Sequence, residues 1–235
     1  MMQIEILMRN GSLLSTSLKE SLIENDECDI CNKIYKNYEK IVVNTDDKSA
    51  SLIYEYISDT ILSILKFGVL FNILLDLNIP ILDKHSLIGA LISIDYEKEK
   101  LDLKKAIANI KIIAIDSILQ FRLPSLIRSW ESLGQLAKNL ILRISTRDEL
   151  YELISYFINS NEYSPRITIT STDPIKIAID GNLYSPIKFT NNSEYNILLS
   201  IIRLHPSHII IKNPLLLSTD LLATFKTLGN KKEPT

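Results

Sequence analysis

The spacing of hydrophobic residues divides the chain into three regions. Near the N-terminus, hydrophobic and polar residues alternate over residues 2–9, hydrophobic residues recur at helical spacing over residues 12–24, and residues 40–45 are rich in β-branched side chains. This pattern predicts a strand, a helix and a second strand. From residue 49 to residue 161 the hydrophobic residues recur every three or four positions, which predicts an almost wholly helical centre.

The central region is expected to contain several helices separated by proline or polar residues. Pro80 ends the first helix, and Asp83 is expected to cap the second. Thr146 and Glu149 have the spacing of a capping box, in which the Thr146 hydroxyl accepts from the amide three residues on while the Glu149 side chain reaches back. The expected helices span residues 49–77, 84–95, 100–122, 124–143 and 147–160.

After Pro165 the hydrophobic pattern changes to every second position. Two alternating stretches, residues 166–173 and 175–182, meet at the polar pair Asp173-Pro174, which favours a turn and predicts a β-hairpin. The remaining pattern predicts a helix, a covered strand and a final helix ended by Gly229, at residues 193–205, 208–213 and 218–229.

Together these elements predict an α+β fold with a mainly helical centre and a small mixed sheet formed from N-terminal and C-terminal strands. The two N-terminal strands cannot form a stable layer alone, so we expect both ends of the chain to share one sheet. We expect a single domain over residues 1–235. Its parts are a strand–helix–strand start, a helical centre, a hairpin–helix–strand–helix region and a polar tail, at residues 1–48, 49–161, 162–229 and 230–235.

Composition restricts the compartment and the classes of partner. Of 235 residues 23% are charged, and the formal net charge is −2, so no overall positive charge attracts nucleic acid or anionic lipid. The start of the chain shows no secretory signal and two cysteines make no disulfide framework, so a cytoplasmic location is expected. Residues 60–82 most resemble a membrane span, but Lys66, Asn72 and Asp76 interrupt them. A charge near the centre of a span costs roughly 2.5–3.5 kcal/mol, so we expect a buried helix and no membrane span.

The sequence offers one weak candidate for a metal or redox site. Cys28 and Cys31 form a C-x-x-C pair, a spacing that occurs in zinc sites and in redox dithiols. His205 and His208 could complete a four-ligand site if the N-terminal strands packed beside the C-terminal sheet. Turn and edge-strand positions are the commoner explanation for both histidines. We therefore expect neither a metal nor another cofactor, and no nucleophile motif or phosphate-binding glycine loop indicates catalysis.

A lysine-rich stretch supplies the alternative of nucleic-acid binding. The lysines are not interleaved with aromatic residues in the manner of a single-strand groove, and a solvated helix face is the usual meaning of such a cluster. The stretch comprises Lys98, Lys100, Lys104 and Lys105, with Arg122 and Arg128 as further candidates.

Arg122 is the residue that most invites a functional interpretation. It ends a row of hydrophobic residues, two positions before Pro124, which suits the first turn of the next helix. A cation in the last turn of a helix meets free carbonyl groups, and this structural role is one explanation. The alternatives are a guanidinium paired with a carboxylate such as Asp116, and an anion-binding or catalytic arginine. In the following helix Trp130 lies on the hydrophobic face.

Four motifs follow one another along the chain: Phe121, Arg122 and Leu123, the pair Tyr156 and Phe157, Pro165, and Pro206 with Ile209, Ile210 and Ile211. In their order and spacing, these motifs resemble the YtxC family of sporulation proteins. The resemblance covers about residues 50–215 and rests on structural motifs. Pro124 departs from it, because a lysine or another polar residue is expected there, and the chain ends in LGNKKEPT where family members continue into a further strand with cysteines.

The resemblance implies a cytoplasmic protein of the sporulation programme, and it carries over no catalytic residue. We therefore expect a non-enzymatic interaction or assembly factor with a protein partner. Phe121, Arg122, Leu123, Trp130, Tyr156 and Phe157 are its candidate structural or interaction residues. Nucleic-acid binding through the lysines and a metal or redox protein using the C-x-x-C pair are the alternatives.

Overall fold

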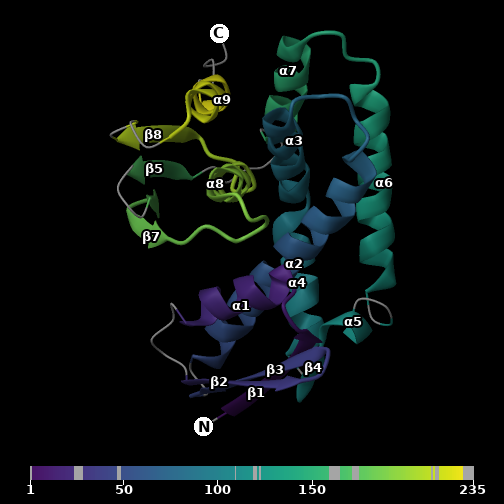
Figure 1. Cartoon of the computed structure of the whole chain (residues 1–235), viewed down its shortest axis with the longest axis vertical. Coiled ribbons are helices and arrows are strands. Elements are labelled where there is room, and N and C mark those ends of the chain that lie inside the picture. The colour runs from purple at the N-terminus through teal and green to yellow at the C-terminus, as the bar shows by residue number, and fades with distance from the viewer. Residues whose placement is uncertain are drawn as a thin grey trace. The chain divides into compact units, whose positions relative to one another are not determined.

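The described residues form two compact units, each with helices and a mixed four-stranded sheet (Figure 1). Unit 1 comprises Met1–Val69 and Asp95–Ser132, and unit 2 comprises Leu70–Ile94 and Leu133–Thr235. The computed structural model describes residues 2–23, 29–46, 49–108, 110–118, 121, 123–158, 165–170, 175–212, 214 and 217–229.

Unit 1 contains a sheet with the strand order β2-β3-β1-β4, in which β1 pairs antiparallel with β3 and parallel with β4, and β2 pairs antiparallel with β3. Helix α1 lies over this sheet (Figure 1), and its Leu14, Leu18 and Leu22, which follow one another at spacings of four residues on one face of the helix, are buried. The elements are β1 (Met2–Arg9), α1 (Leu13–Ile23), β2 (Asp29–Tyr35), β3 (Tyr38–Thr45), most of α2 (Ala50–Leu74), α4 (Tyr96–Ile107), β4 (Ile112–Ala114), α5 (Ile115–Ser117) and the start of α6 (Pro124–Ile141).

Unit 2 contains a second sheet with the strand order β7-β6-β5-β8, where β5 and β8 are parallel and the other pairs antiparallel. Ile167, Ile169 and Ile177 are its fully buried side chains. Besides the ends of α2 and α6, the elements are α3 (Ile81–Ser93), α7 (Arg147–Ile158), β5 (Arg166–Thr170), β6 (Lys176–Ile179), β7 (Asn182–Tyr184), α8 (Ser193–Ile202), β8 (His208–Lys212) and α9 (Thr219–Gly229).

The two sheets confirm the α+β class and correct one expectation about it. The N-terminal and C-terminal strands form separate sheets and share none. The physical reason is that β2 and β4, which the hydrophobic pattern did not reveal, extend the N-terminal pair to four strands, enough for a layer of its own. The helical centre contributes to both units. A single domain over residues 1–235 stays a prediction.

Two of the expected helices have different limits in the structure. The helix expected at residues 100–122 begins at Tyr96 and ends at Ile107, and Ile112–Ala114 then pair with β1 as an edge strand. A short run of β-branched residues fits either structure, and the open edge of β1 decides in favour of the strand because it satisfies backbone hydrogen bonds there. The helix that Arg122 was expected to end therefore stops well before it.

The second correction concerns Asp83. The helix expected to start after it begins instead at Ile81, directly after Pro80, and Asp83 lies in its first turn with no exposed surface. The capping box at the start of α7 is confirmed, because the Glu149 amide donates to Thr146 Oγ1 at 3.2 Å and the Thr146 amide donates to Glu149 Oε2 at 3.4 Å. Asp83 and Glu149 both lie in the first turn of a helix, but of the two only Glu149 takes part in a capping box.

Candidate functional site

A group of polar side chains, all but one of them buried, lies between α2 and α4 in unit 1. Asp59, Ser63 and Lys66 follow one another at spacings of four and three residues, so they share one face of α2. Tyr96 and Glu99 share a face of α4 by the same rule. We call these five residues the polar seam.

Tyr96 joins the two helices at one end of the polar seam. Its hydroxyl lies 2.5 Å from Asp59 Oδ1 and 2.7 Å from Ser63 Oγ. Because the Asp59 carboxylate can only accept, the tyrosine donates to it and the Ser63 hydroxyl in turn donates to the tyrosine. The three side chains therefore form a directed chain of hydrogen bonds across the helix contact.

Lys66 and Glu99 form a buried ion pair at the other end of the polar seam. Lys66 Nζ donates to Glu99 Oε2 at 2.7 Å, and the side chains are 0% and 9% exposed. The second carboxylate oxygen, Oε1, accepts from the indole nitrogen of Trp130 on α6 at 2.9 Å. Glu99 thus ties α2, α4 and α6 of unit 1 together through one carboxylate.

Burial shifts both pKa values of this pair toward the neutral forms. Loss of hydration lowers the pKa of Lys66, against the opposing pull of the Glu99 charge, and it raises the pKa of Glu99, against the hydrogen bonds from Lys66 and Trp130. Such groups can exchange a proton in principle. Here the Lys66 side chain has no exposed surface and the Glu99 side chain is 9% exposed, so the geometry fits an internal tie between helices.

Burial of α2 inside the structure accounts for its membrane-like composition. Among the described residues, α2 is the one helix whose length and hydropathy would allow it to cross a membrane, and 61% of its most hydrophobic window is buried inside the structure. Lys66 lies within this helix and is bound to Glu99. These contacts are those of a core helix with one polar face.

Two of the four lysines of α4 are engaged by carboxylates of unit 1. Lys100 Nζ lies 3.1 Å from Glu97 and 3.4 Å from Glu55, and Lys104 Nζ lies 3.5 Å from Glu55. Burial would lower the pKa of Lys100, but the charges of Asp59, Glu97 and Glu55 outweigh it and raise this pKa. The face proposed for nucleic-acid contact therefore carries less uncompensated positive charge than the sequence suggests.

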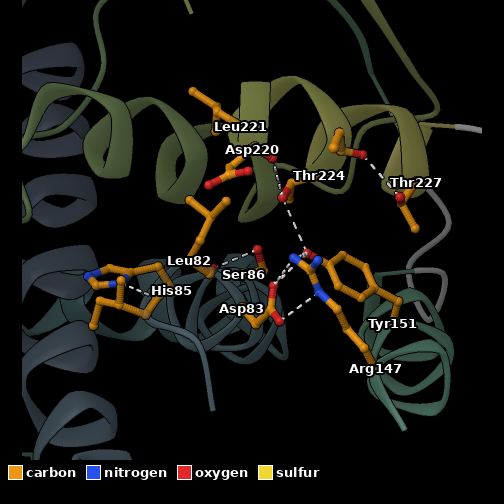
Figure 2. Close-up of polar contacts among 12 residues, drawn as sticks. Leu82, Asp83, His85, Ser86, Arg147, Tyr151, Asp220, Leu221, Thr224 and Thr227 are labelled. Atoms are coloured by element: carbon orange, nitrogen blue, oxygen red, sulfur yellow. Dashed lines mark hydrogen bonds and ion pairs between the residues drawn. The ribbon is translucent and has the colours of Figure 1, made fainter. Parts of the chain in front are cut away.

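A second buried polar cluster lies in unit 2, around Asp83 (Figure 2). Arg147 binds both carboxylate oxygens, with Nε donating to Oδ2 at 2.9 Å and Nη2 donating to Oδ1 at 2.7 Å. Tyr151 donates to Oδ1 at 2.8 Å, and its oxygen lies 3.2 Å from Thr224 Oγ1 on α9. Burial, together with the Asp83 charge, raises the pKa of Tyr151. This cluster, like the polar seam, ties three helices: α3, α7 and α9.

In both clusters the charged side chains are bound to each other. Comparison with protein-family models, characterised proteins and solved structures finds no match to this chain. The YtxC resemblance and the function it implies therefore stay predictions.

The described residues of the metal candidate belong to different units. Cys31 is exposed on β2 of unit 1, whereas His205 and His208 belong to unit 2, and Cys28 lies outside the described residues. His205 is buried at a turn with φ of 49°, and His208 is exposed at the start of β8. Within the described part of the chain, no three histidine, cysteine or carboxylate side chains gather as a metal site would require.

The candidate interaction residues fall into two groups. Trp130 is buried and bound to Glu99, so its role is structural. Phe121 and Tyr156 are 75% and 71% exposed, while Leu123 and Phe157 are partly exposed, with the Phe157 ring 6.0 Å from that of Tyr156. Arg122 lies outside the described residues, so its three interpretations stay open.

The sequence interpretation missed the partners within both clusters. Lys66 counted only as an interruption of a membrane span, and Glu99 was not singled out. The signal for Glu99 is its position, because Tyr96, Glu99, Leu103 and Ile107 are the buried residues of α4 and follow at spacings of three and four. A carboxylate on the hydrophobic face of a helix requires a buried partner.

Proposed function

We propose that this protein is a non-enzymatic interaction or assembly factor of the sporulation programme, as its resemblance to the YtxC family suggests. The observation that carries the proposal is the exposure of Phe121 and Tyr156, two aromatic residues on which the resemblance depends. Aromatic side chains that reach solvent are enriched among the residues that anchor protein interfaces.

The charged pairs of the two clusters support the same proposal. Lys66 with Glu99 and Arg147 with Asp83 bind each other and thereby join helices. A catalytic group must reach its substrate, whereas these atoms are already engaged in internal contacts. The chemistry that remains accessible on the described surface includes exposed aromatic rings suited to contact with a protein partner.

The proposal is tested by affinity capture of the full chain from sporulating cells, comparing wild type with Phe121→Ser and Tyr156→Ser. We expect either substitution to reduce the recovery of one defined partner at least about tenfold, the loss typical when an interface anchor is truncated. Leu183→Ser is the matched control, because Leu183 is 81% exposed and is not among the motif residues. Equal recovery with all three variants would contradict a role for these aromatic residues.

The sporulation part of the proposal needs a separate measurement. We expect the protein to accumulate as cells enter sporulation, and Phe121→Ser to lower the yield of spores while thermal unfolding of the purified variant stays unchanged. A constant protein level before and after entry would remove the sporulation assignment and leave the interaction proposal to the capture experiment.

A further inference from the structure

Strand β2 is exposed at the edge of the unit 1 sheet. It is one of the two outer strands of this sheet, the other being β4, and among the strands that the structure describes it pairs only with β3. Every residue of β2 is exposed except Ile30, which is partly exposed. An outer strand offers backbone N–H and C=O groups to an incoming strand, and proteins use such edges to bind partners by adding a strand to the sheet.

The charges on β2 are arranged symmetrically. Asp29 and Lys33 lie two residues before and two residues after Cys31, and all three point to the same face of the sheet because alternate residues of a strand do so. When two identical strands pair antiparallel around a two-fold axis at Cys31, each Asp29 lies opposite the Lys33 of the other copy. Centring the axis on Asn32 instead places Asp29 opposite Tyr35, so only the pairing centred on Cys31 matches the charges.

We propose that β2 is a homodimerisation edge, at which a second copy of the chain pairs antiparallel through Asp29–Lys33 and joins the two unit 1 sheets. Opposite charges directly across an antiparallel pair stabilise it and fix its register, while like charges destabilise it. The symmetry of the charges favours a second copy over an unrelated strand, because a two-fold interface brings the same patch of both copies together. This inference is independent of the proposed function.

The simpler explanation of Lys33 is the opposite one. A lysine on an outer strand commonly prevents association, since its charge must be desolvated when another strand approaches. The two explanations differ in their consequence for Lys33→Asp. If Lys33 blocks the edge, the wild type is monomeric and stays monomeric when another charged residue replaces the lysine. If Lys33 pairs with Asp29 of a second copy, its replacement weakens the dimer.

The test is sedimentation equilibrium of the full chain over a series of concentrations. Pairing along one short strand buries less surface than a standard stable interface, so we expect a weak dimer with a micromolar dissociation constant. Asp29→Lys and Lys33→Asp should each raise this constant at least about tenfold, because each turns two attractive pairs into repulsive ones. Asp102→Lys and Lys105→Asp, exposed residues of α4 with the same changes of charge, are the matched controls and should change nothing.

Mixing the two β2 variants gives the decisive result. One strand then carries two lysines and the other two aspartates, so the mixture should form a heterodimer although neither variant dimerises alone, and the double variant should recover self-association. In a Cys28→Ser background, a short bismaleimide should link Cys31 to Cys31 in wild type and not in Lys33→Asp. Unfolding curves establish that each variant is folded. A monomer at every concentration, unchanged dimerisation of the single variants, or a mixture without heterodimer would each overturn the proposal.

Discussion

Two helix contacts, one in each unit, hold their partners by different means. In unit 1, α2 and α4 meet through the polar seam, in which Tyr96 bridges Asp59 and Ser63 while Lys66 binds Glu99. In unit 2, α3 and α8 meet through hydrophobic and aromatic side chains. A Cβ atom added to Gly89 of α3 would lie 3.0 Å from the Cβ atom of Ile202 on α8, so the helices approach closely there.

The comparison shows what specifies each contact. Buried polar atoms must find partners of the right kind, so the polar seam permits one register of α2 against α4. The α3–α8 contact is specified by shape instead: Gly89 admits Ile202, and the ring of His85 stacks on Tyr195 with centroids 4.4 Å apart. The first contact should therefore be sensitive to the loss of a partner, and the second to added volume.

The largest effect is expected from Lys66→Met. The substitution removes the cation and leaves the Glu99 carboxylate buried with only Trp130 as a hydrogen-bond donor among the contacts described above. Breaking a buried ion pair from one side costs about 3–5 kcal/mol, so the free energy of unfolding in urea should fall by that amount. Adding Glu99→Gln removes the stranded charge and should restore part of the loss. A loss below about 1 kcal/mol, with no recovery in the double variant, would contradict the role given to this pair.

Arg147→Met is the matched control from unit 2. Arg147 also binds a fully buried carboxylate, but its own side chain is 57% exposed and Tyr151 still donates to Asp83 after the change. We therefore expect a smaller loss, about 1.5–3 kcal/mol, the range for a hydrogen bond to a charged group. If Arg147→Met were the more damaging of the two, burial of the cation would not be what makes the Lys66–Glu99 pair sensitive.

Local sequence signals predicted the elements of the fold better than their assembly. The capping box at Thr146 and Glu149 acts within a single turn, so its residues lie next to each other in sequence and in space. The pairing of β4 with β1 joins Ile113 to Ile6 across more than a hundred residues. No local pattern reports such a pairing, because its energy comes from the sheet edge that happens to be available.

The two clusters were hidden for a similar reason. Glu99 lies 33 residues from Lys66, and Asp83 lies 64 residues from Arg147, so neither partner can be identified from the other by spacing. The sequence does indicate one member of each pair, Glu99 or Asp83, as a charged residue among hydrophobic residues of a helix that are themselves buried. Asp83 was interpreted as a cap because the same residue type serves both roles, and only the position of Arg147 distinguishes them.

Two helical glycines test the second half of the comparison. Gly89→Val should destabilise the protein by about 1–3 kcal/mol, because the added atoms meet Ile202 and overpacking is costly. Gly68 of α2 has open space where a Cβ would lie, so Gly68→Ala should stabilise by up to about 1 kcal/mol through helix propensity. Both changes are measured by urea unfolding. If Gly68→Ala also destabilised the protein, and by as much as Gly89→Val, close packing would not be what distinguishes the two glycines.

The smallest effect is expected from the titration of His85 at the α3–α8 contact. Burial lowers the pKa of His85 below its ordinary value of 6.5, the nearby Lys84 charge acts in the same direction, and the hydrogen bond with the Ile81 carbonyl opposes both. Because that carbonyl can only accept, Nδ1 carries the proton and donates across 2.7 Å.

The sign of the pH dependence follows from this shift. As the pH falls below 6.5, His85 takes up a proton in the unfolded chain before it does so in the folded protein. The contribution of the neutral His85 ring to the free energy of unfolding is therefore fully present above pH 6.5 and is lost as the pH is lowered toward the folded pKa. His85→Asn does not titrate and can still donate to the Ile81 carbonyl, so its free energy of unfolding should lose this dependence. The measurement is the difference in the free energy of unfolding between wild type and His85→Asn from about pH 5 to pH 8. Taking the difference cancels the contributions of the carboxylates and of the other histidines. If the free energies of unfolding of wild type and His85→Asn changed with pH in parallel, the His85 ring would be hydrated in the folded protein. Water would then reach the α3–α8 contact more easily than its close packing at Gly89 indicates.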